Sequence, residues 1–519
     1  MSSRDATRRS ERLVSLDVFR GMTVAGMLLV NNPGSWSAIY PPLAHAPWHG
    51  WTPTDLIFPF FLFIVGITTE LSLQARRARG DDERAILRQI LRRGTLIFLF
   101  GFLLSGFPFF TWPPALEGAS FLERVVHRYE HCRIMGVLQR IGLAYLGGAL
   151  LTWRTSLRQQ VGLVVVLLFG YWALMTLVPV PDTGVPGRFM LDKPDALLSA
   201  WIDRTVLGVN HLWVGGKTWD PEGLLSTVPA IGTMMLGTFA GKWIAQLDRP
   251  LADRLAGLFA VGALGMMLGL MWHWVFPINK SLWTSSYVVF TAGTGAVALA
   301  TCMWIIDVMQ VRRWTFPFVV YGVNPMLAFL GSGLMARVIS SLWTWPTASG
   351  TRLSAQGFVF NTLYASWLPP REASFAYAVS FVTLWFLILW VAWKRGYVLK
   401  VRRHAPLRCP FPSCPRTRCT GRPLRDAVGV VGRTGGSGRA RWTAAGHTDS
   451  STGARFGVEI ALEADCQDDD AAYRGVGRSR VAPYGPARSR GPDRRPGRTT
   501  RQPDPPWRVG RDGGEHHPR

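Results

Sequence analysis

The chain of 519 residues has few acidic side chains and few cysteines: 33 Asp and Glu stand against 57 Lys and Arg, with only six Cys. Cys409, Cys414 and Cys419 follow one another at five-residue intervals, but no clean His or Cys partner completes a zinc-binding set. His127 and His131 have the spacing of neighbours on a helix face, yet a third ligand is not evident. No metal site is therefore predicted.

Residues 401–519 lack lysine and long apolar stretches. Their 23 Arg against 12 Asp and Glu give this part alone a net charge of +11. A segment so poor in apolar residues and so rich in Arg, Gly and Pro cannot bury a hydrophobic core. We therefore expect a disordered basic tail at residues 404–519, after a membrane domain at residues 1–403. Charges in such a tail are usually solvated, so a nucleic-acid partner is not predicted.

Long polar stretches are scarce in residues 1–400, and this excludes a soluble globular protein. About 20 apolar residues are needed for a helix to cross the hydrocarbon core. The predicted spans are 14–31, 56–73, 94–110, 134–152, 160–178, 224–244, 255–276, 285–309, 316–339 and 375–397. An eleventh, tilted or re-entrant piece could lie within 337–368. The predicted fold is an all-α, polytopic membrane bundle of about 10–11 transmembrane helices.

The orientation of the bundle follows from the basic residues. Arginines cluster before the first span, and the loops 74–93, 153–159 and 310–314 are also basic, whereas most intervening loops are aromatic and poor in Lys and Arg. Segment 111–133, with several arginines, is the exception. The first span lacks a small-residue cleavage site and is expected to be retained. Both termini are predicted to be cytoplasmic, with His45 on the outer side.

Two polar pairs stand at the ends of the first two spans. Asp17 and Arg20 are three residues apart, so they share a helix face and can form an ion pair; Arg20 can equally anchor a phosphorylated cofactor from the cytoplasm. His45 precedes the second span by about ten residues, and Asp55 lies at the start of that span. Asp55 can orient the histidine or cap the helix, and both alternatives remain open.

Further polar residues are predicted to gather at the outer mouth of the bundle. Arg140, in the fourth span, is too deep to reach water easily and is expected to face a polar cavity. Asp220 and Glu222 precede the sixth span, and Asn279 and Lys280 precede the eighth. Such a cluster, with tryptophans nearby for stacking, suits a hydrophilic ligand such as a sugar.

Several motifs occur in one order along residues 1–400. They are SLDVFRGM (15–22), HAPWHGWTPTDLIFPFFLFIVG (45–66), RIMGVLQRIGLAY (133–145), DPEGLLST (220–227) and FPINKSLWTSSY (276–287). On these motifs the chain resembles heparan-α-glucosaminide N-acetyltransferase and its bacterial relatives.

The resemblance implies transfer of an acetyl group from cytoplasmic acetyl-CoA to the amine of an amino sugar or glycan terminus outside the membrane. It places the active histidine at His45, and a nearby asparagine at Asn31. His49 stands where the motif commonly has asparagine and ranks below His45. The implied location is the plasma membrane, the inner membrane of a bacterium. Lipid and a second copy of the chain, in a homodimer, are the other expected partners.

In the predicted mechanism Asp17, Arg20 and Arg140 bind acetyl-CoA, while Asp220, Glu222, Asn279 and Lys280 bind the acceptor. His45, assisted by Asp55, accepts the acetyl group or deprotonates the amine. Asn31 or Lys280 stabilises the oxyanion. The rival hypothesis is an amino-sugar transporter that uses the same polar cluster. Transporters often consist of two similar halves, and no internal repeat is found here, which counts against that rival.

Overall fold

A computed structural model describes residues 13–111, 116, 118–347 and 351–397. The predicted tail at 404–519 and the arginines before the first span lie outside these residues. All ten predicted spans coincide with helices. The α-helices are α1 (Val14–Asn31), α2 (Pro53–Ala78), α3 (Glu83–Gly106), α4 (Phe121–Glu130), α5 (Val137–Arg154), α6 (Leu157–Leu177), α7 (Leu198–Leu207), α8 (Thr227–Ile244), α9 (Leu251–His273), α10 (Ser285–Met303), α11 (Phe316–Val323), α12 (Pro325–Arg337), α13 (Ala355–Leu363) and α14 (Pro370–Lys394).

Shorter elements complete the described residues. Two π-helical turns, Trp304–Val308 and Val338–Leu342, continue α10 and α12. The 3₁₀ turns are Pro41–Leu43, Gly187–Phe189, Pro194–Ala196 and Val209–His211. Strands β1 (Thr344–Pro346) and β2 (Arg352–Ser354) form an antiparallel hairpin in which Trp345 pairs with Leu353.

Within the described residues, seven helices are long and apolar enough to cross a membrane on their own. They are α1, α2, α6, α9, α10 with its π-turn, α12 with its π-turn, and α14. The fold is thus the predicted multi-pass helical bundle. The other three predicted spans, now α3, α5 and α8, fall short of this criterion because they carry Arg or Lys, or are rich in Gly and Thr.

Within 337–368 the described residues do not form a continuous helix, so the eleventh, tilted or re-entrant piece stays a prediction. This segment forms the end of the α12 π-turn, the β1–β2 hairpin and α13. With nine residues, α13 is about 13 Å long, less than half the thickness of the hydrocarbon core. The span predicted at 316–339 is broken at Asn324, where α11 ends and Pro325 begins α12.

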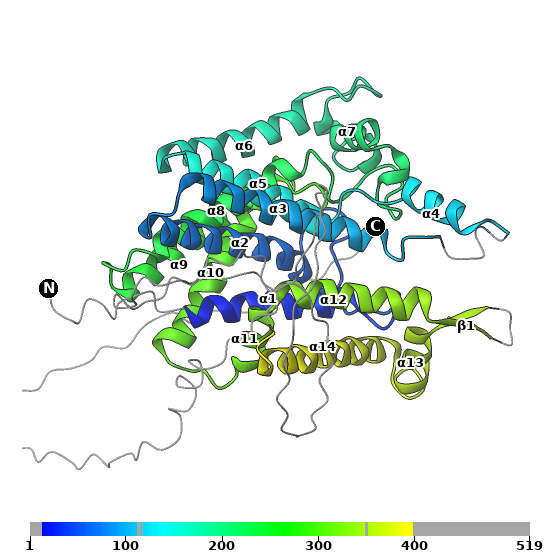
Figure 1. Ribbon diagram of the computed structural model, residues 1–519. Coiled ribbons are helices and arrows are strands. Elements are labelled where there is room, and N and C mark those ends of the chain that lie inside the picture. The colour runs from blue at the N-terminus through cyan, green and yellow to red at the C-terminus, as the bar shows by residue number, and fades with distance from the viewer. Residues whose placement is uncertain (1–12, 112–115, 117, 348–350, 398–519) are drawn as a thin grey trace, which may run out of the picture. The chain divides into compact units, whose positions relative to one another are not determined.

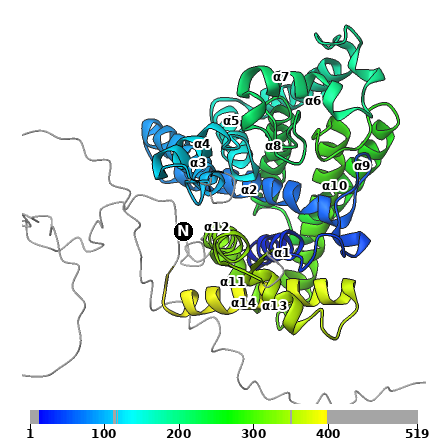
Figure 2. The same ribbon diagram turned by 90° about the vertical axis from the view of Figure 1, so that its right-hand side faces the viewer.

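Figures 1 and 2 show α1, α11, α12 and α14 side by side, with α2 between this group and helices α5 and α8. Glycines allow the closest approaches. Gly66 of α2 faces Met234 and Gly237 of α8, and a Cβ atom at either glycine would overlap the backbone of the other helix. Small residues serve this purpose between membrane helices because apolar burial cannot drive association in lipid. This contact fixes α8, and the loop before it, against the start of α2.

Candidate functional site

Asp55 connects the start of α2 to His45. Its Oδ2 atom accepts hydrogen bonds from the backbone N–H groups of Thr52 and Ala46, both at 3.0 Å. Its Oδ1 atom lies 2.6 Å from His45 Nδ1. Asp55 is 1% exposed, and Tyr287 donates a hydrogen bond to its backbone carbonyl. Both alternatives from the sequence therefore hold, because one carboxylate oxygen caps the helix while the other faces the histidine.

The contact with Asp55 sets the state of the His45 ring. A carboxylate only accepts hydrogen bonds, so we assign the ring proton to Nδ1 and the free electron pair to Nε2. The imidazole is half exposed, and Asp55 is not. This is the arrangement of an oriented base or nucleophile, with its reactive nitrogen open to an incoming group.

Lys280 is the second charged group beside His45. Its Nζ atom lies 3.0 Å from Nε2 and 3.3 Å from Nδ1. If the ammonium lay on the axis of the Nε2 electron pair, its distance to Nδ1 would be much longer than the observed 3.3 Å. Nζ therefore lies over the imidazole ring and not on that axis. Burial lowers the pKa of the Lys280 ammonium, although the carboxylates of Glu222 and Asp55 oppose the shift.

Asn279 and Trp283 shape the loop that carries Lys280. The Asn279 carboxamide is buried and accepts a hydrogen bond from the backbone of Leu282 at 2.9 Å. Its amide nitrogen lies 3.3 Å from His49 Nδ1. Trp283 has a φ of 51°, in the left-handed region, and its buried indole donates to Thr233 at 3.0 Å. Asn279 is therefore occupied in holding this loop together.

Arg133 was not among the predicted site residues, yet it binds two of them. Its guanidinium donates to both carboxylate oxygens of Asp220, at 2.8 and 2.5 Å, and also to Glu222. Burial alone would raise the pKa of Glu222, but Arg133 and Arg140 hold it below the ordinary value. One sequence signal could have revealed Arg133: it lies in segment 111–133, whose arginines are the exception to the alternation of basic and non-basic loops.

Arg140 is fully buried in α5, as its position predicted. It donates to the Ser226 hydroxyl and lies 5.0 Å from the centre of the Trp283 ring, a cation–π contact. Its Nε and Nη1 atoms have no hydrogen-bond partner among the described residues. The structure places Arg140 beside the loops that carry Glu222 and Lys280.

The remaining predicted residues lie around this cluster. His49 Nε2 is 3.0 Å from Asp192, and burial lowers the pKa of its imidazole while Asp192 opposes the shift. Asn31 is the last residue of α1 and is exposed. Within the part of the chain that the structure describes, no hydrogen bond or ion pair joins Asn31 to His45.

The Asp17–Arg20 pair lies elsewhere. The two side chains form the predicted ion pair at 2.5 Å, and Arg20 Nε donates to the Gly322 carbonyl of α11 at 2.7 Å. A Cβ atom at Gly21 would overlap the backbone of Phe318, so this glycine permits the approach of α11. Arg20 is eleven residues before Asn31, about 16 Å along the axis of α1.

These features define a class: a multi-pass membrane protein with an oriented His–Asp pair and a buried ion network at one end of its bundle. A sequence profile described as "Heparan-alpha-glucosaminide N-acetyltransferase, catalytic" matches residues 12–269. Residues 12–269 are therefore similar to the catalytic region of this family. The matched region contains His45, Asp55 and Arg140 but ends before Lys280.

Two curated relatives bear the name heparan-alpha-glucosaminide N-acetyltransferase. The mouse protein is 29% identical over 385 residues, which cover 65% of this chain and 56% of the relative. The human protein is 29% identical over 376 residues, covering 64% of this chain and 54% of the relative. The chain thus spans little more than half the length of the curated relatives it matches.

Proposed function

We propose that this protein is a transmembrane N-acetyltransferase. It moves an acetyl group from cytoplasmic acetyl-CoA to the amine of an amino sugar or glycan terminus on the outer side of the membrane. The observation that carries the proposal is the His45–Asp55 pair. The buried Asp55 carboxylate contacts Nδ1 of the half-exposed imidazole, which leaves Nε2 available to react. The match of residues 12–269 to the catalytic profile supports the same chemistry.

Two routes fit this geometry. In the covalent route, Nε2 attacks the thioester carbonyl carbon, an N–C bond forms, the C–S bond breaks and coenzyme A leaves as the thiolate. The sugar amine then displaces the imidazole, which regains its electron pair, and the amine proton passes to solvent or the thiolate. In the direct route, the amine nitrogen attacks the thioester carbonyl carbon while Nε2 takes the amine proton; the N–C bond forms, the C–S bond breaks and coenzyme A leaves as the thiolate.

Lys280 is the better candidate for stabilising the oxyanion. Its ammonium is already within 3.0 Å of the reacting nitrogen of His45, whereas Asn31 has no such contact among those described. A positive charge held beside the developing negative oxygen lowers the barrier most in a partly buried site. Glu222, near Lys280 and Arg140, remains the candidate partner for the acceptor amine.

The ion pair at the other end of α1 is proposed to receive the phosphates of acetyl-CoA. The Arg20 side chain is partly exposed, so a phosphate could reach its guanidinium beside Asp17. The pantetheine arm would then run along α1 toward its end at Asn31, about 16 Å from Arg20 by the helix rise. Arg140 would act at the acetyl end rather than at the phosphates, because it lies with Glu222 and Trp283.

The test is acetyl transfer by the purified full chain in detergent, with radiolabelled acetyl-CoA and glucosamine. We expect labelled N-acetylglucosamine from the wild type. A matched control is His127→Ala, since His127 is a partly buried histidine that contacts Thr111 rather than the His45 cluster. Saturable glucosamine uptake into vesicles without any acetylated product would overturn the proposal in favour of a transporter.

Sidedness needs its own experiment. Arg76 and Arg77 lie in the last turn of α2, at the end opposite His45, and support a cytoplasmic location for that end. We expect a membrane-impermeant thiol reagent applied to whole cells to label His49→Cys and spare Ala78→Cys. Strong labelling at position 78 with none at 49 would reverse the topology.

A further inference from the structure

The exposed residues of α3 lie on one face of the helix. From Arg84 onward they are Arg84, Arg88, Leu91, Arg92, Thr95, Leu99 and Leu103. Each lies three or four positions from another member, so together they form one stripe. The opposite face is buried, and its Gly94 and Gly101 pack against Leu146 and Leu138 of α5. Figure 2 shows α3 and α5 together at one side of the bundle, so the stripe faces out of the bundle.

The stripe changes from apolar to cationic along the helix. Its three leucines are between 43% and 51% exposed, and an apolar surface of this kind on a membrane bundle faces lipid. Arg92 stands at the end of the apolar stretch, and Arg88 and Arg84 follow at intervals of about 6 Å. Polar headgroups form a layer about 5–8 Å thick on each side of the hydrocarbon core. Arg92 and Arg88 therefore lie at headgroup depth. This end of the bundle is opposite His45, because α2 begins near His45 and α3 follows the other end of α2.

Arg84, Arg88 and Arg92, which we call the arginine row, form no ion pair with an acidic side chain of the described residues. Asp81, three residues before Arg84, already pairs with Arg76 at 3.1 Å. The positions three and four residues from Arg88 and Arg92 hold no Asp or Glu. Like charges four residues apart on a helix repel one another, so the arginine row destabilises α3 until an anion covers it.

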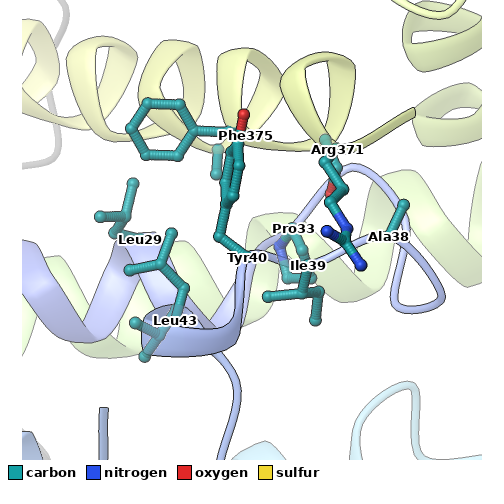
Figure 3. A pocket seen from close by; sticks show the side chains of 11 residues that line it. Leu29, Pro33, Ala38, Ile39, Tyr40, Leu43, Arg371 and Phe375 are labelled. Carbon is teal, nitrogen blue, oxygen red and sulfur yellow. The ribbon is translucent and has the colours of Figure 1, made fainter. Parts of the chain in front are cut away.

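Arg371, at the start of α14, shows a different arrangement at the end of a span. Figure 3 shows Arg371 beside Ile39, and Tyr40 beside Phe375. The rings of Tyr40 and Phe375 meet edge to face at 5.9 Å and occupy the space between α14 and the loop after α1. Glu372 follows Arg371 directly and offsets its charge. That place therefore has little free space and no net positive charge, whereas the arginine row is open and cationic.

We propose that the arginine row binds anionic phospholipid. The phosphates pair with Arg88 and Arg92, because a planar guanidinium can donate two parallel hydrogen bonds to one phosphate. The acyl chains lie along Leu91, Leu99 and Leu103. A zwitterionic phospholipid carries its own cation beside the phosphate, so it neutralises the row less well than an anionic one. The proposal does not depend on acetyl transfer, and its test does not measure turnover.

The test compares two photoactivatable lipids, phosphatidylglycerol and phosphatidylcholine, each with a diazirine on the acyl chain. Each probe is added to phosphatidylcholine nanodiscs that contain the full chain, and mass spectrometry of chymotryptic peptides maps the label. The quantity measured is the ratio of phosphatidylglycerol label to phosphatidylcholine label. We expect this ratio to be about twentyfold higher on α3 than on α9, from about fivefold for each of Arg88 and Arg92. Equal ratios on α3 and α9 would overturn the inference.

Variants test whether these particular arginines are responsible. Arg88→Gln combined with Arg92→Gln should lower the ratio on α3 to that on α9. The matched control combines Arg249→Gln with Arg313→Gln, which removes the same charge from exposed loops at the same end of the bundle. The control should leave the ratio on α3 unchanged. An equal loss in both double variants would contradict the proposal, because it would assign the preference to the general charge of that end.

A salt titration of the wild type completes the test without any substitution. At about 1 M salt the Debye length is about 3 Å, so exposed charges are largely screened. The ratio on α3 should then fall to that on α9, while the phosphatidylcholine label stays constant. This measurement decides the case even if the Arg88 and Arg92 variant fails to fold. A ratio on α3 that does not respond to salt would overturn the inference.

Discussion

The two charged regions of the bundle are built in different ways. Around His45, the charged groups that meet are far apart in sequence, 87 residues for Arg133 and Asp220 and 235 for His45 and Lys280. Around Arg20, the partner Asp17 is three residues away on the same helix. The first network exists only when several helices assemble. The Asp17–Arg20 ion pair lies within one helix, although Arg20 also donates to the Gly322 carbonyl of α11.

The carboxylates differ in burial in the same direction. Those of Asp55 and Glu222 are 1% and 8% exposed and that of Asp17 is 13% exposed, whereas the cations Arg133 and Arg20 are similarly exposed, at 25% and 22%. A buried ion that loses its partner is costly, and a partly exposed ion can turn to water or to a ligand. The His45 region is therefore suited to fixed chemistry and the Arg20 region to reversible binding.

The largest effect is expected from His45→Ala. It should reduce acetyl transfer by at least about 10²–10⁴-fold, the usual contribution of a general base, or by more if His45 carries the acetyl group. His49→Ala should only weaken turnover, because His49 contacts Asp192 and Asn279 rather than Asp55. The double variant tests whether His49 rescues any activity. Near-normal turnover in His45→Ala, with acetyl-CoA binding intact, would remove the catalytic assignment.

Next comes the buried network. Arg133→Leu leaves Asp220 and Glu222 without their shared cation, so we expect a loss of about 3 kcal/mol in the free energy of unfolding. Arg20→Gln, which opens the partly exposed pair, should cost less than about 1 kcal/mol. Thermal unfolding of both variants in the same detergent gives the comparison. Equal losses would show that the two regions do not differ in the way described.

Arg20→Gln should have its main effect on binding. If Arg20 holds a phosphate of acetyl-CoA, the KM for acetyl-CoA rises about tenfold while kcat changes little. Arg249→Gln is a suitable control, since this arginine stacks on Trp243 and does not contact Asp17. A fall in kcat with unchanged KM would instead place Arg20 in the chemical step.

A smaller effect concerns Asp203, which packs beside the loop that carries Glu222. Burial raises the pKa of the Asp203 carboxyl to about 7, although a hydrogen bond from the Leu224 N–H acts to lower it. Between about pH 4 and 7 the folded protein therefore keeps a proton that the unfolded chain has released, and stability falls as pH rises through this window. Asp203→Asn should flatten that dependence and stabilise the protein by about 1 kcal/mol at pH 8. The exposed Asp195→Asn should not, as thermal unfolding across pH would show.

The smallest effect is expected from removal of the predicted tail. A chain that ends at residue 403 should keep wild-type turnover and thermal stability, because the described helices end at Lys394. A chain that ends at Trp390 loses the last turn of α14 and serves as a control for damage to the bundle. A well-folded 1–403 chain without transferase activity would contradict the prediction.

Much of the bundle could be predicted because its signals are local. Apolar runs of about 20 residues locate the spans, and each of the ten predicted ones is helical, although the one at 316–339 is two helices. The Asp17–Arg20 pair follows from the helical repeat, and the cap at the start of α2 follows from Thr52 and Asp55. The break at Asn324-Pro325 follows from the missing N–H of proline. Each of these involves residues within one or two turns.

The sequence by itself thus determined the membrane class, the helices and the residues with unusual polarity. Only the tertiary structure decided which of those residues meet. Lys280 reaches His45 because α10 packs against α2, and Arg133 takes up both Asp220 and Glu222 because α5 packs against α8. The physical reason is that a charge pair between loops depends on helix packing, which no periodicity in the chain encodes.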